Sequence, residues 1–272
     1  MIWSQYLLIS FNMKNNLFLA SIQSEWLKAK KSSSSWFVWL GALFVPFIIT
    51  LIQTFYPNRF GVSVLDPFWI RLFERTWEMT AILLLPMGIV IACSLICQIE
   101  FRNNTWKQVY ATPQSLSTIF FAKYFVVLMM FFKWLIIFTI AIFISAYLPS
   151  LLNGRMVFTD EVVPTKYILE NAGSFYISAL PIIALQYSLS MRFRNFMVPI
   201  GVGVALVICS MFLISWKYGY LFPFVYTSYK FFEFSGMPRY TAGYSIEALS
   251  LAAFTLITII HYLLYISSRE RG

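Results

Sequence analysis

Six stretches of this sequence are long and apolar enough to cross a lipid bilayer, and no other feature constrains the fold as strongly. A membrane-spanning helix needs about 20 mainly apolar residues, because its backbone polar groups must be hydrogen-bonded within the segment. The stretches cover residues 34–56, 79–99, 119–147, 173–191, 197–216 and 245–267. We therefore predict an all-α, polytopic membrane protein whose residues 1–272 form a single transmembrane domain.

The composition excludes a water-soluble fold. Of the 272 residues, 60% are hydrophobic and 11% are charged, and the mean hydropathy is +0.73. Soluble domains carry about 25% charged residues. The formal net charge of +9 would suggest a nucleic-acid partner in a soluble protein. In a chain with six apolar stretches we instead expect the lipid membrane as partner and no nucleic acid.

The distribution of charge between the apolar stretches predicts the orientation. The N-terminal segment, residues 100–123, residues 192–194 and the C-terminus together carry eleven Lys or Arg and three acidic residues. The other three connections carry eight Lys or Arg and, with Glu247 at the beginning of the last stretch, eight acidic residues. Because basic residues are enriched in cytoplasmic loops, we expect a multi-pass protein of the cytoplasmic membrane with both termini in the cytoplasm.

The beginning of the chain lacks the pattern of a cleaved signal peptide. The opening letters MIWSQYLLISF contain neither a basic start nor a small-residue cleavage site. Met13 precedes a more coherent pattern than Met1, and both remain candidates for the native start.

Two segments have the periodicity of amphipathic helices rather than of membrane spans. From Asn15 to Lys31, apolar Phe18, Ile22 and Trp26 recur every four residues among polar ones, as in a helix that lies in the membrane interface. In residues 67–80 one side of the expected helix carries Trp69, Leu72, Phe73 and Thr76, and the other carries Arg71, Glu74, Arg75 and Glu78. We expect this helix to lead into the second span from outside. The late segment KYGYLFPFVYTSYKFF is rich in aromatic residues and is compatible with a loop that dips into the membrane or with an aromatic belt.

Catalytic signals are sparse. The chain has no GxxxxGK[ST] phosphate-binding loop. Its single histidine, His261, is typical of a packing residue, and Cys93, Cys97 and Cys209 lie in apolar stretches as small core residues do. A membrane-embedded lipid enzyme would need clustered His, Asp or Glu. We expect no enzyme activity and no cofactor in this chain.

Two polar residues inside apolar stretches are candidates for a translocation pathway. Lys133 is the one charge well within such a stretch, and a lysine at the centre of a membrane helix costs about 2.5–3.5 kcal/mol on insertion scales. The competing and preferred interpretation is that the 29-residue stretch projects from the membrane and lets Lys133 reach the interface. Gln186 is the second candidate.

The break between the second and third stretches, residues 97–125, is the most informative segment. Glu100 and Arg102 mark the exit from the membrane, and Trp106 with Lys107 follows in a short polar segment. Pro113 ends any helix there, because the residue before proline avoids the α conformation. Ser115 or Ser117 can then cap the next helix, which carries Lys123. We predict a compact helix-turn with exposed charges and an aromatic anchor; the alternative is an ordinary solvated loop.

Two stretches resemble the permeases of ABC-2 type transporters. In that family a Glu ends the second span, a Gly-Thr and a Pro follow, and a Lys opens the third span. The stretch EFRNNTWKQVYATPQSLSTIFFAKYF resembles this pattern. The corresponding residues are Glu100, Thr105, Pro113 and Lys123, while Asn104 replaces the usual Gly. SEWLKAKKSSSSWFVWL resembles the stretch before the family's first span, with Glu25, Trp26, Lys28 and Lys31. Short six-span chains of this kind resemble permeases of lantibiotic and bacteriocin immunity exporters.

The resemblance implies a division of labour between two polypeptides. The polar segment would be a cytoplasmic coupling helix that docks on a separate ABC ATPase subunit, which would hold ATP and Mg. The residues implied in coupling are Glu100, Arg102, Asn104, Thr105, Trp106, Lys107, Pro113 and Lys123. This chain would export an amphiphilic peptide, drug or lipid-like molecule, together with a second copy or a sister permease. The alternatives are a non-transporting membrane anchor or sensor and, less favoured, a lipid enzyme.

Overall fold

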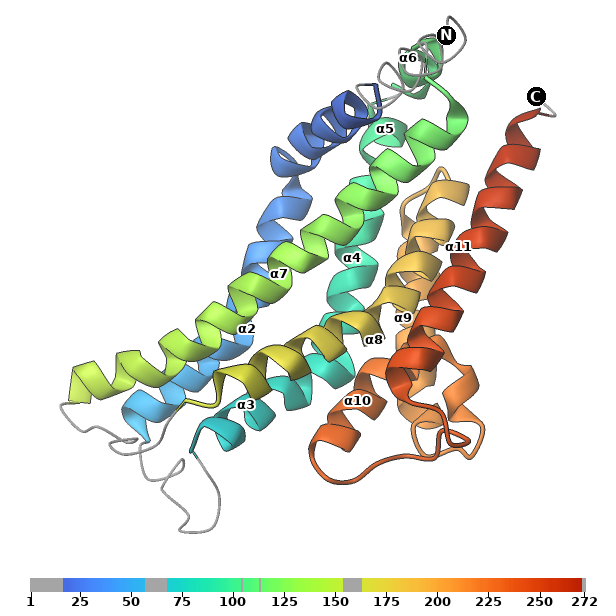
Figure 1. Ribbon diagram of the computed structural model, residues 1–272. Helices are drawn as coiled ribbons and strands as arrows, with labels where there is room; N and C mark the ends of the chain where they lie inside the picture. The colour runs from blue at the N-terminus through green and yellow to red at the C-terminus, as the bar shows by residue number, and fades with distance from the viewer. Residues whose placement is uncertain (1–16, 57–67, 104, 113, 154–162, 271–272) are drawn as a thin grey trace, which may run out of the picture.

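The structure, a computed structural model, describes residues 17–56, 68–103, 105–112, 114–153 and 163–270, and these residues fold into helices and short connections without a strand (Figure 1). Met1 and Met13, the two candidate starts, lie outside the described residues. The described chain begins within a helix over residues 17–30. The elements that follow are α2 (Ser33–Phe55), α3 (Phe68–Met79), η2 (Thr80–Leu84), α4 (Leu85–Cys97), α5 (Ile99–Arg102), α6 (Trp106–Ala111), α7 (Leu116–Asn153), α8 (Thr165–Arg192), α9 (Met197–Leu213), η3 (Gly219–Leu221), η4 (Pro223–Val225), α10 (Tyr226–Phe234) and α11 (Ile246–Glu270).

Each of the six predicted spans corresponds to a helix of the described chain. Five helical stretches are long and apolar enough to cross a membrane: Ser33–Phe55, Phe68–Cys97, Leu116–Leu152, Thr165–Arg192 and Ile246–Ser267. The sixth, α9, has 17 residues and is about 25 Å long at 1.5 Å per residue, slightly less than the hydrocarbon core. The all-α polytopic fold is therefore confirmed.

The predicted amphipathic segment 67–80 and the second span form one continuous helical stretch. Its aromatic face is buried, with Trp69, Leu72 and Phe73 nearly inaccessible. The turn between α3 and α4 is a wide π-turn, Thr80–Leu84, and Pro86 follows it directly. Because proline offers no backbone amide and its ring crowds the preceding turn, a local widening of the helix is expected there.

Helix α4 lies at the centre of the bundle. It contacts α2, α8 and α9, while α2 also packs along α7 and α8 along α11. The approach of α9 depends on Gly203, because a Cβ there would lie 2.6 Å from both Gln186 Oε1 and Val90 Cγ1. Small residues allow membrane helices to approach closely in this way.

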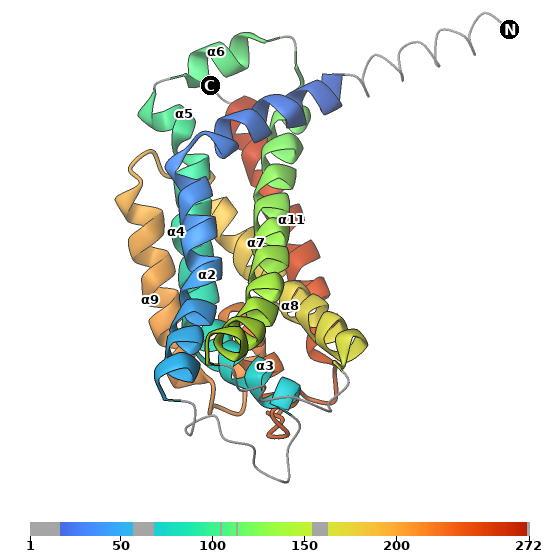
Figure 2. The same ribbon diagram turned by 90° about the vertical axis from the view of Figure 1, so that its left-hand side faces the viewer.

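The two ends of the bundle differ in construction. The helix over residues 17–30, α5, α6 and the last turns of α11 lie at one end, called here the α6 end, and α3 and α10 lie at the other, the α10 end (Figures 1 and 2). At the α10 end the aromatic segment of residues 217–234 forms η3, η4 and α10, with Phe224 and Tyr229 buried. It packs against α8 and α9, and nearby Trp77 stacks on Phe175 with ring centroids 3.8 Å apart.

Candidate functional site

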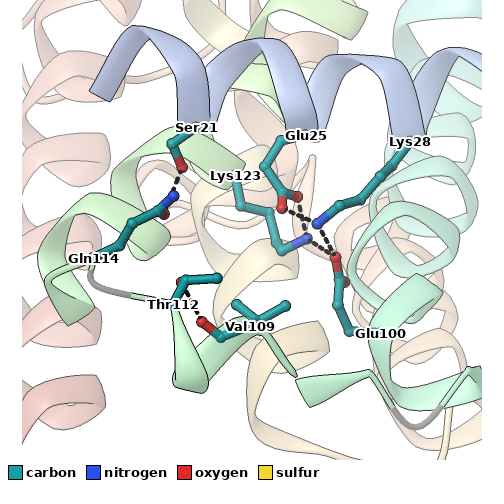
Figure 3. A network of polar contacts seen from close by, with 8 residues as sticks. All are labelled: Ser21, Glu25, Lys28, Glu100, Val109, Thr112, Gln114 and Lys123. Carbon is teal, nitrogen blue, oxygen red and sulfur yellow. Dashed lines mark hydrogen bonds and ion pairs between the residues drawn. The ribbon is translucent and has the colours of Figure 1, made fainter. Parts of the chain in front are cut away.

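Four charged side chains from three separate parts of the chain meet inside the α6 end (Figure 3). Lys123 is the centre of this ion-pair cluster, which also comprises Glu25, Lys28 and Glu100. The Lys123 residue is only 1% exposed. Its ammonium donates to Glu25 Oε2 at 2.5 Å and to Glu100 Oε1 at 2.8 Å. A buried lysine needs such partners, because an unpaired charge in this environment costs several kcal/mol.

Lys123 reaches this position because α7 begins just before it. Ser115 caps the helix, since its hydroxyl accepts a hydrogen bond from the Thr118 backbone amide at 3.1 Å, as the sequence predicted for Ser115 or Ser117. Lys123 lies two turns further along, on a side of α7 where Phe120 and Val127 are also buried. The start of α7 therefore carries its charge inward.

Glu25 comes from the helix over residues 17–30, where it lies on the buried side with Ser21 and Ala29. It accepts hydrogen bonds from Lys123 and, one turn away, from Lys28. Burial by itself would raise the pKa of Glu25, but the charges and hydrogen bonds of Lys123 and Lys28 hold the pKa below its ordinary value. Glu25 is therefore ionised at neutral pH.

Glu100 lies in α5, one short turn after the end of α4, and is 1% exposed. Its Oε1 accepts from both Lys123 and Lys28, the latter at 3.2 Å. Its Oε2 is buried without a hydrogen-bond partner in the described chain. Two carboxylates and two ammonium groups leave the cluster neutral when all four are ionised, which limits the cost of burying them.

The cluster fastens the polar segment between α4 and α7 to the N-terminal helix. Glu100 holds the beginning of the segment, and at its far side Ser21 donates to Gln114 Oε1 at 3.1 Å. Both Ser21 and Glu25 belong to the helix over residues 17–30, which crosses this end of the bundle (Figure 2). A displacement of the segment would consequently move the N-terminal helix and α7 with it.

Between these two attachments the segment forms α5 and α6. The Thr105 amide donates to the Glu100 carbonyl at 3.0 Å and closes the turn. Trp106 packs half-buried against Phe101, with ring centroids 5.1 Å apart, whereas Arg102 and Lys107 are exposed. The predicted helix-turn with an aromatic anchor is thus present. Asn104 and Pro113 lie outside the described residues.

Sequence reasoning placed the charges of this segment on the surface, and this is wrong for Glu100 and Lys123. Both are buried because the N-terminal helix covers them. The sequence assigned Glu25 to an interfacial helix and Glu100 and Lys123 to a coupling segment, and the structure brings the three together. One signal was available: each lies where its segment was expected to meet the membrane boundary.

The remaining residues of the predicted N-terminal helix have contrasting environments. Trp26 is half-buried against the bundle, while Lys31 is exposed where the helix ends. Leu17, Leu19 and Leu27 are 43%, 57% and 55% exposed. Exposed leucines beside exposed lysines are typical of a helix in a membrane interface.

The two pathway candidates lie in different surroundings. Lys133 is half-buried on α7, and its ammonium is 5.0 Å from the ring centroid of Trp39 on α2. Gln186 is fully buried on α8, where its amide donates to Ser94 Oγ and to the Pro199 carbonyl, both at 2.9 Å. These bonds join α8 to α4 and α9. The assignment of either residue to a pathway stays a prediction.

His261 and the cysteines behave mostly as packing residues. His261 is buried edge-on to Phe120, with ring centroids 4.9 Å apart, so the prediction of a packing role is confirmed. Cys93 and Cys97 are buried, whereas Cys209 is exposed on α9. The expectation of a core position is wrong for Cys209, because hydropathy alone does not distinguish the inward from the outward face of a membrane helix.

The fold defines an all-helical membrane protein with several helices long and apolar enough to span a bilayer. Residues 21–211 match the model of a family described as ABC-2 family transporter protein. The chain therefore belongs to the ABC-2 transporter family, as its two motif stretches indicated. The match includes all four members of the ion-pair cluster and both α5 and α6. Searches of curated proteins and of solved structures gave no match.

Proposed function

We propose that this chain is the membrane subunit of an ATP-driven exporter and that a separate ABC ATPase docks on α5 and α6. The observation that carries the proposal is the double attachment of this segment to the N-terminal helix. At one side Glu100 binds Lys28 directly and Glu25 by way of Lys123, and at the other side Gln114 binds Ser21. A segment held in this way transmits force to the spans instead of bending away from it.

The exposed part of the segment has the chemistry of a docking surface. Arg102 and Lys107 are exposed, and Trp106 is held against Phe101. Arginine and tryptophan are enriched among residues that dominate interface energies. Exposed cations also favour a partner surface with acidic residues and speed its approach. ATP and Mg would be bound by that partner.

Coupling would proceed through the ion-pair cluster. When the ATPase subunits close on their nucleotides, α6 would be displaced, and Glu100 would pull Lys123 and Glu25 with it. The beginning of α7, the end of α4 and the N-terminal helix would then tilt as one unit. A second copy or a sister permease would complete the path for an amphiphilic substrate, moved outward across the cytoplasmic membrane.

The proposal is tested by reversing the exposed charges without disturbing the buried ones. The variant Arg102→Glu/Lys107→Glu should retain at least about tenfold less ATPase on co-purification than the parent chain. It should also lose substrate-stimulated ATP hydrolysis. Arg75→Glu, an exposed site on α3 at the α10 end, is the control and should retain both. Equal retention by both variants would contradict docking at α6. A retained ATPase without any stimulated hydrolysis would favour an anchor or sensor instead of a transporter.

A second measurement tests the orientation. A cysteine introduced at Lys107 in a background without the three native cysteines should react with an impermeant maleimide in inside-out vesicles and not in intact cells. Labelling in intact cells would place α6 outside and end the proposal.

A further inference from the structure

A cavity with a basic rim opens at the α6 end, beside the ion-pair cluster. Its volume is about 1000 Å³, and it lies between the beginning of α2, the end of α4 with α5, and the connection from α8 to α9. Four cationic side chains line it: Lys28, Lys31, Arg102 and Arg194. The described residues that line it include no Asp or Glu. Lys28 is already paired with Glu25 and Glu100, so Lys31, Arg102 and Arg194 give the cavity the charge of a site for an anion.

The rim offers hydrogen-bond donors in addition to charge. Ser32, Ser33 and Ser34 line the cavity where α2 begins. Ser33 is exposed, whereas the Ser32 hydroxyl donates to the Ala29 carbonyl and accepts from the Ser34 amide. The backbone amides and the dipole at the beginning of a 23-residue helix favour a negative group nearby. A phosphate, which combines negative charge with several acceptor oxygens, is the group that such a rim suits best.

The cavity lining also includes apolar side chains, and large apolar residues are exposed beside it. Leu95, Ile99 and Phe196 belong to the lining. Next to it, Trp36 on α2 is 72% exposed and Met197 on α9 is 61% exposed. Large exposed apolar residues of this kind on a membrane protein contact acyl chains. The cavity thus lies where a polar boundary meets a lipid-facing surface.

A second, apolar groove lies further along the seam between α2 and α4. This groove, of about 270 Å³, is lined by Phe37 and Gly41 from α2 and by Gly88 and Ile91 from α4, with Phe131 and Trp134 of α7 also in its lining. Ser34, Phe37 and Gly41 are one helical turn apart along α2, and so are Leu95, Ile91 and Gly88 along α4. The two hollows therefore share one seam.

From this arrangement we propose that the cavity and groove together bind an anionic phospholipid of the adjacent leaflet. The phosphate of the headgroup lies among Lys31, Arg102 and Arg194, and one acyl chain follows the α2–α4 seam. The lipid stabilises the junction of the N-terminal helix with α2, next to the ion-pair cluster. The site shares Arg102 with the proposed docking surface of the ATPase, but lipid binding by the purified chain can be measured without an ATPase or a transported substrate.

The test measures lipid retained by the purified, delipidated chain in detergent, by native mass spectrometry. Phosphatidylglycerol and phosphatidylcholine with identical acyl chains are compared, and glycerol phosphate serves as the free headgroup. We expect phosphatidylglycerol to bind at least about tenfold more tightly than phosphatidylcholine. Glycerol phosphate should bind far more weakly, because it cannot occupy the groove. Equal binding of the two lipids, or binding of glycerol phosphate as tight as that of the lipid, would overturn the proposal.

Matched variants separate the site from general surface charge. Lys31→Gln/Arg194→Gln removes two rim charges and should weaken phosphatidylglycerol binding about tenfold. Lys30→Gln/Arg192→Gln removes two exposed charges nearby that do not line the cavity and should weaken it less than twofold. Equal losses in the two double variants would show an unspecific basic surface and overturn the site.

The groove is tested by filling it. A Cβ at Gly88 meets no atom within 4 Å, and Gly88 lines the groove, so the side chain of Gly88→Leu starts in open space there. It should weaken binding of long-chain phosphatidylglycerol about tenfold and leave the dihexanoyl form unchanged. Unchanged long-chain binding, together with an unaltered unfolding temperature, would refute the position of the acyl chain.

Discussion

Lys123 and Lys230 each place one ammonium group between two carboxylates, but they belong to opposite ends of the bundle. At the α6 end, the Lys123 side chain is 2% exposed and its partners Glu25 and Glu100 are 9% and 1% exposed. At the α10 end, the Lys230 side chain is 11% exposed, and Glu233 and Glu247, at 2.8 and 2.7 Å, are 43% and 27% exposed. The chemistry is the same, whereas the access to water differs.

The two clusters also join different parts of the chain. Glu25 is 98 residues from Lys123, and the cluster connects three elements that nothing in the local sequence holds together. Glu233 is one turn from Lys230 in α10. Glu247 lies in the first turn of α11, only 17 residues after Lys230. The Lys230 cluster therefore fastens neighbouring elements, while the Lys123 cluster decides whether distant elements move together.

This difference predicts unequal costs when each lysine is removed. The largest loss is expected for Lys123→Met, which leaves the buried carboxylates of Glu25 and Glu100 with only the partly exposed Lys28 as a counter-charge. Removal of one partner of a buried ion pair costs about 3–5 kcal/mol, so we expect such a decrease in the free energy of unfolding, measured by SDS titration in mixed micelles. A loss below about 1 kcal/mol would show that water reaches the cluster and that the contrast with Lys230 is false.

A smaller loss is expected when the three buried charges of the cluster are removed and only Lys28, whose side chain is 33% exposed, stays charged. Glu25→Gln/Glu100→Gln/Lys123→Met removes the buried charges together, and apolar or neutral replacements of buried ion pairs are often nearly neutral for stability. We expect the triple variant to lie within about 2 kcal/mol of the parent, and so to be more stable than Lys123→Met alone. ATPase stimulation should still be lost, because the segment would no longer be tied to α7. Losses that simply add would argue against coupling among these residues.

The membrane helices could be predicted because the bilayer sets their length. Both α2 and α11 lie within a few residues of the predicted stretches, since hydropathy falls sharply where each leaves the membrane. The extension of α8 back to Thr165 was missed, because its first two turns are polar and hydropathy ends the prediction at 173. The amphipathic face of Trp69, Leu72 and Phe73 was correctly predicted, because a single helix carries the whole pattern.

The ion-pair cluster could not be predicted as a cluster. Periodicity reports which side of one helix is apolar, but it does not report which helix covers that side. Glu25 and Lys123 each look like ordinary boundary charges within their own segments. Their meeting depends on the path of the N-terminal helix across the end of the bundle, and that path is fixed by tertiary packing.

At the α10 end, Lys230→Met should cost about 1 kcal/mol, because Glu233 and Glu247 can regain water when the lysine is lost. Burial lowers the pKa of Lys230, but Glu233 and Glu247 raise it, and the net result is a raised pKa. A raised lysine pKa stabilises the fold below the unfolded value of about 10.4 and loses this effect as the pH rises through the folded value. The stability difference between parent and variant should therefore stay constant from pH 6 to 9 and shrink above about pH 10.5. A difference that shrinks already below pH 9 would refute the assigned pairing.

The smallest effect is expected at an ion pair open to water, which extends the comparison to its limit. Arg75 and Glu78 on α3 are one turn apart, with Nη1 and Oε2 separated by 3.4 Å and side chains 69% and 49% exposed. Exposed pairs one turn apart contribute about 0.3–0.5 kcal/mol. Arg75→Ala should thus change the free energy of unfolding by about 0.5 kcal/mol or less, measured in the same micelles as the lysine variants. If Arg75→Ala cost as much free energy of unfolding as Lys230→Met, exposure to water would not determine the cost of breaking these ion pairs. Costs that fall from Lys123 through Lys230 to Arg75 would tie the cost to the water that each charge loses on folding.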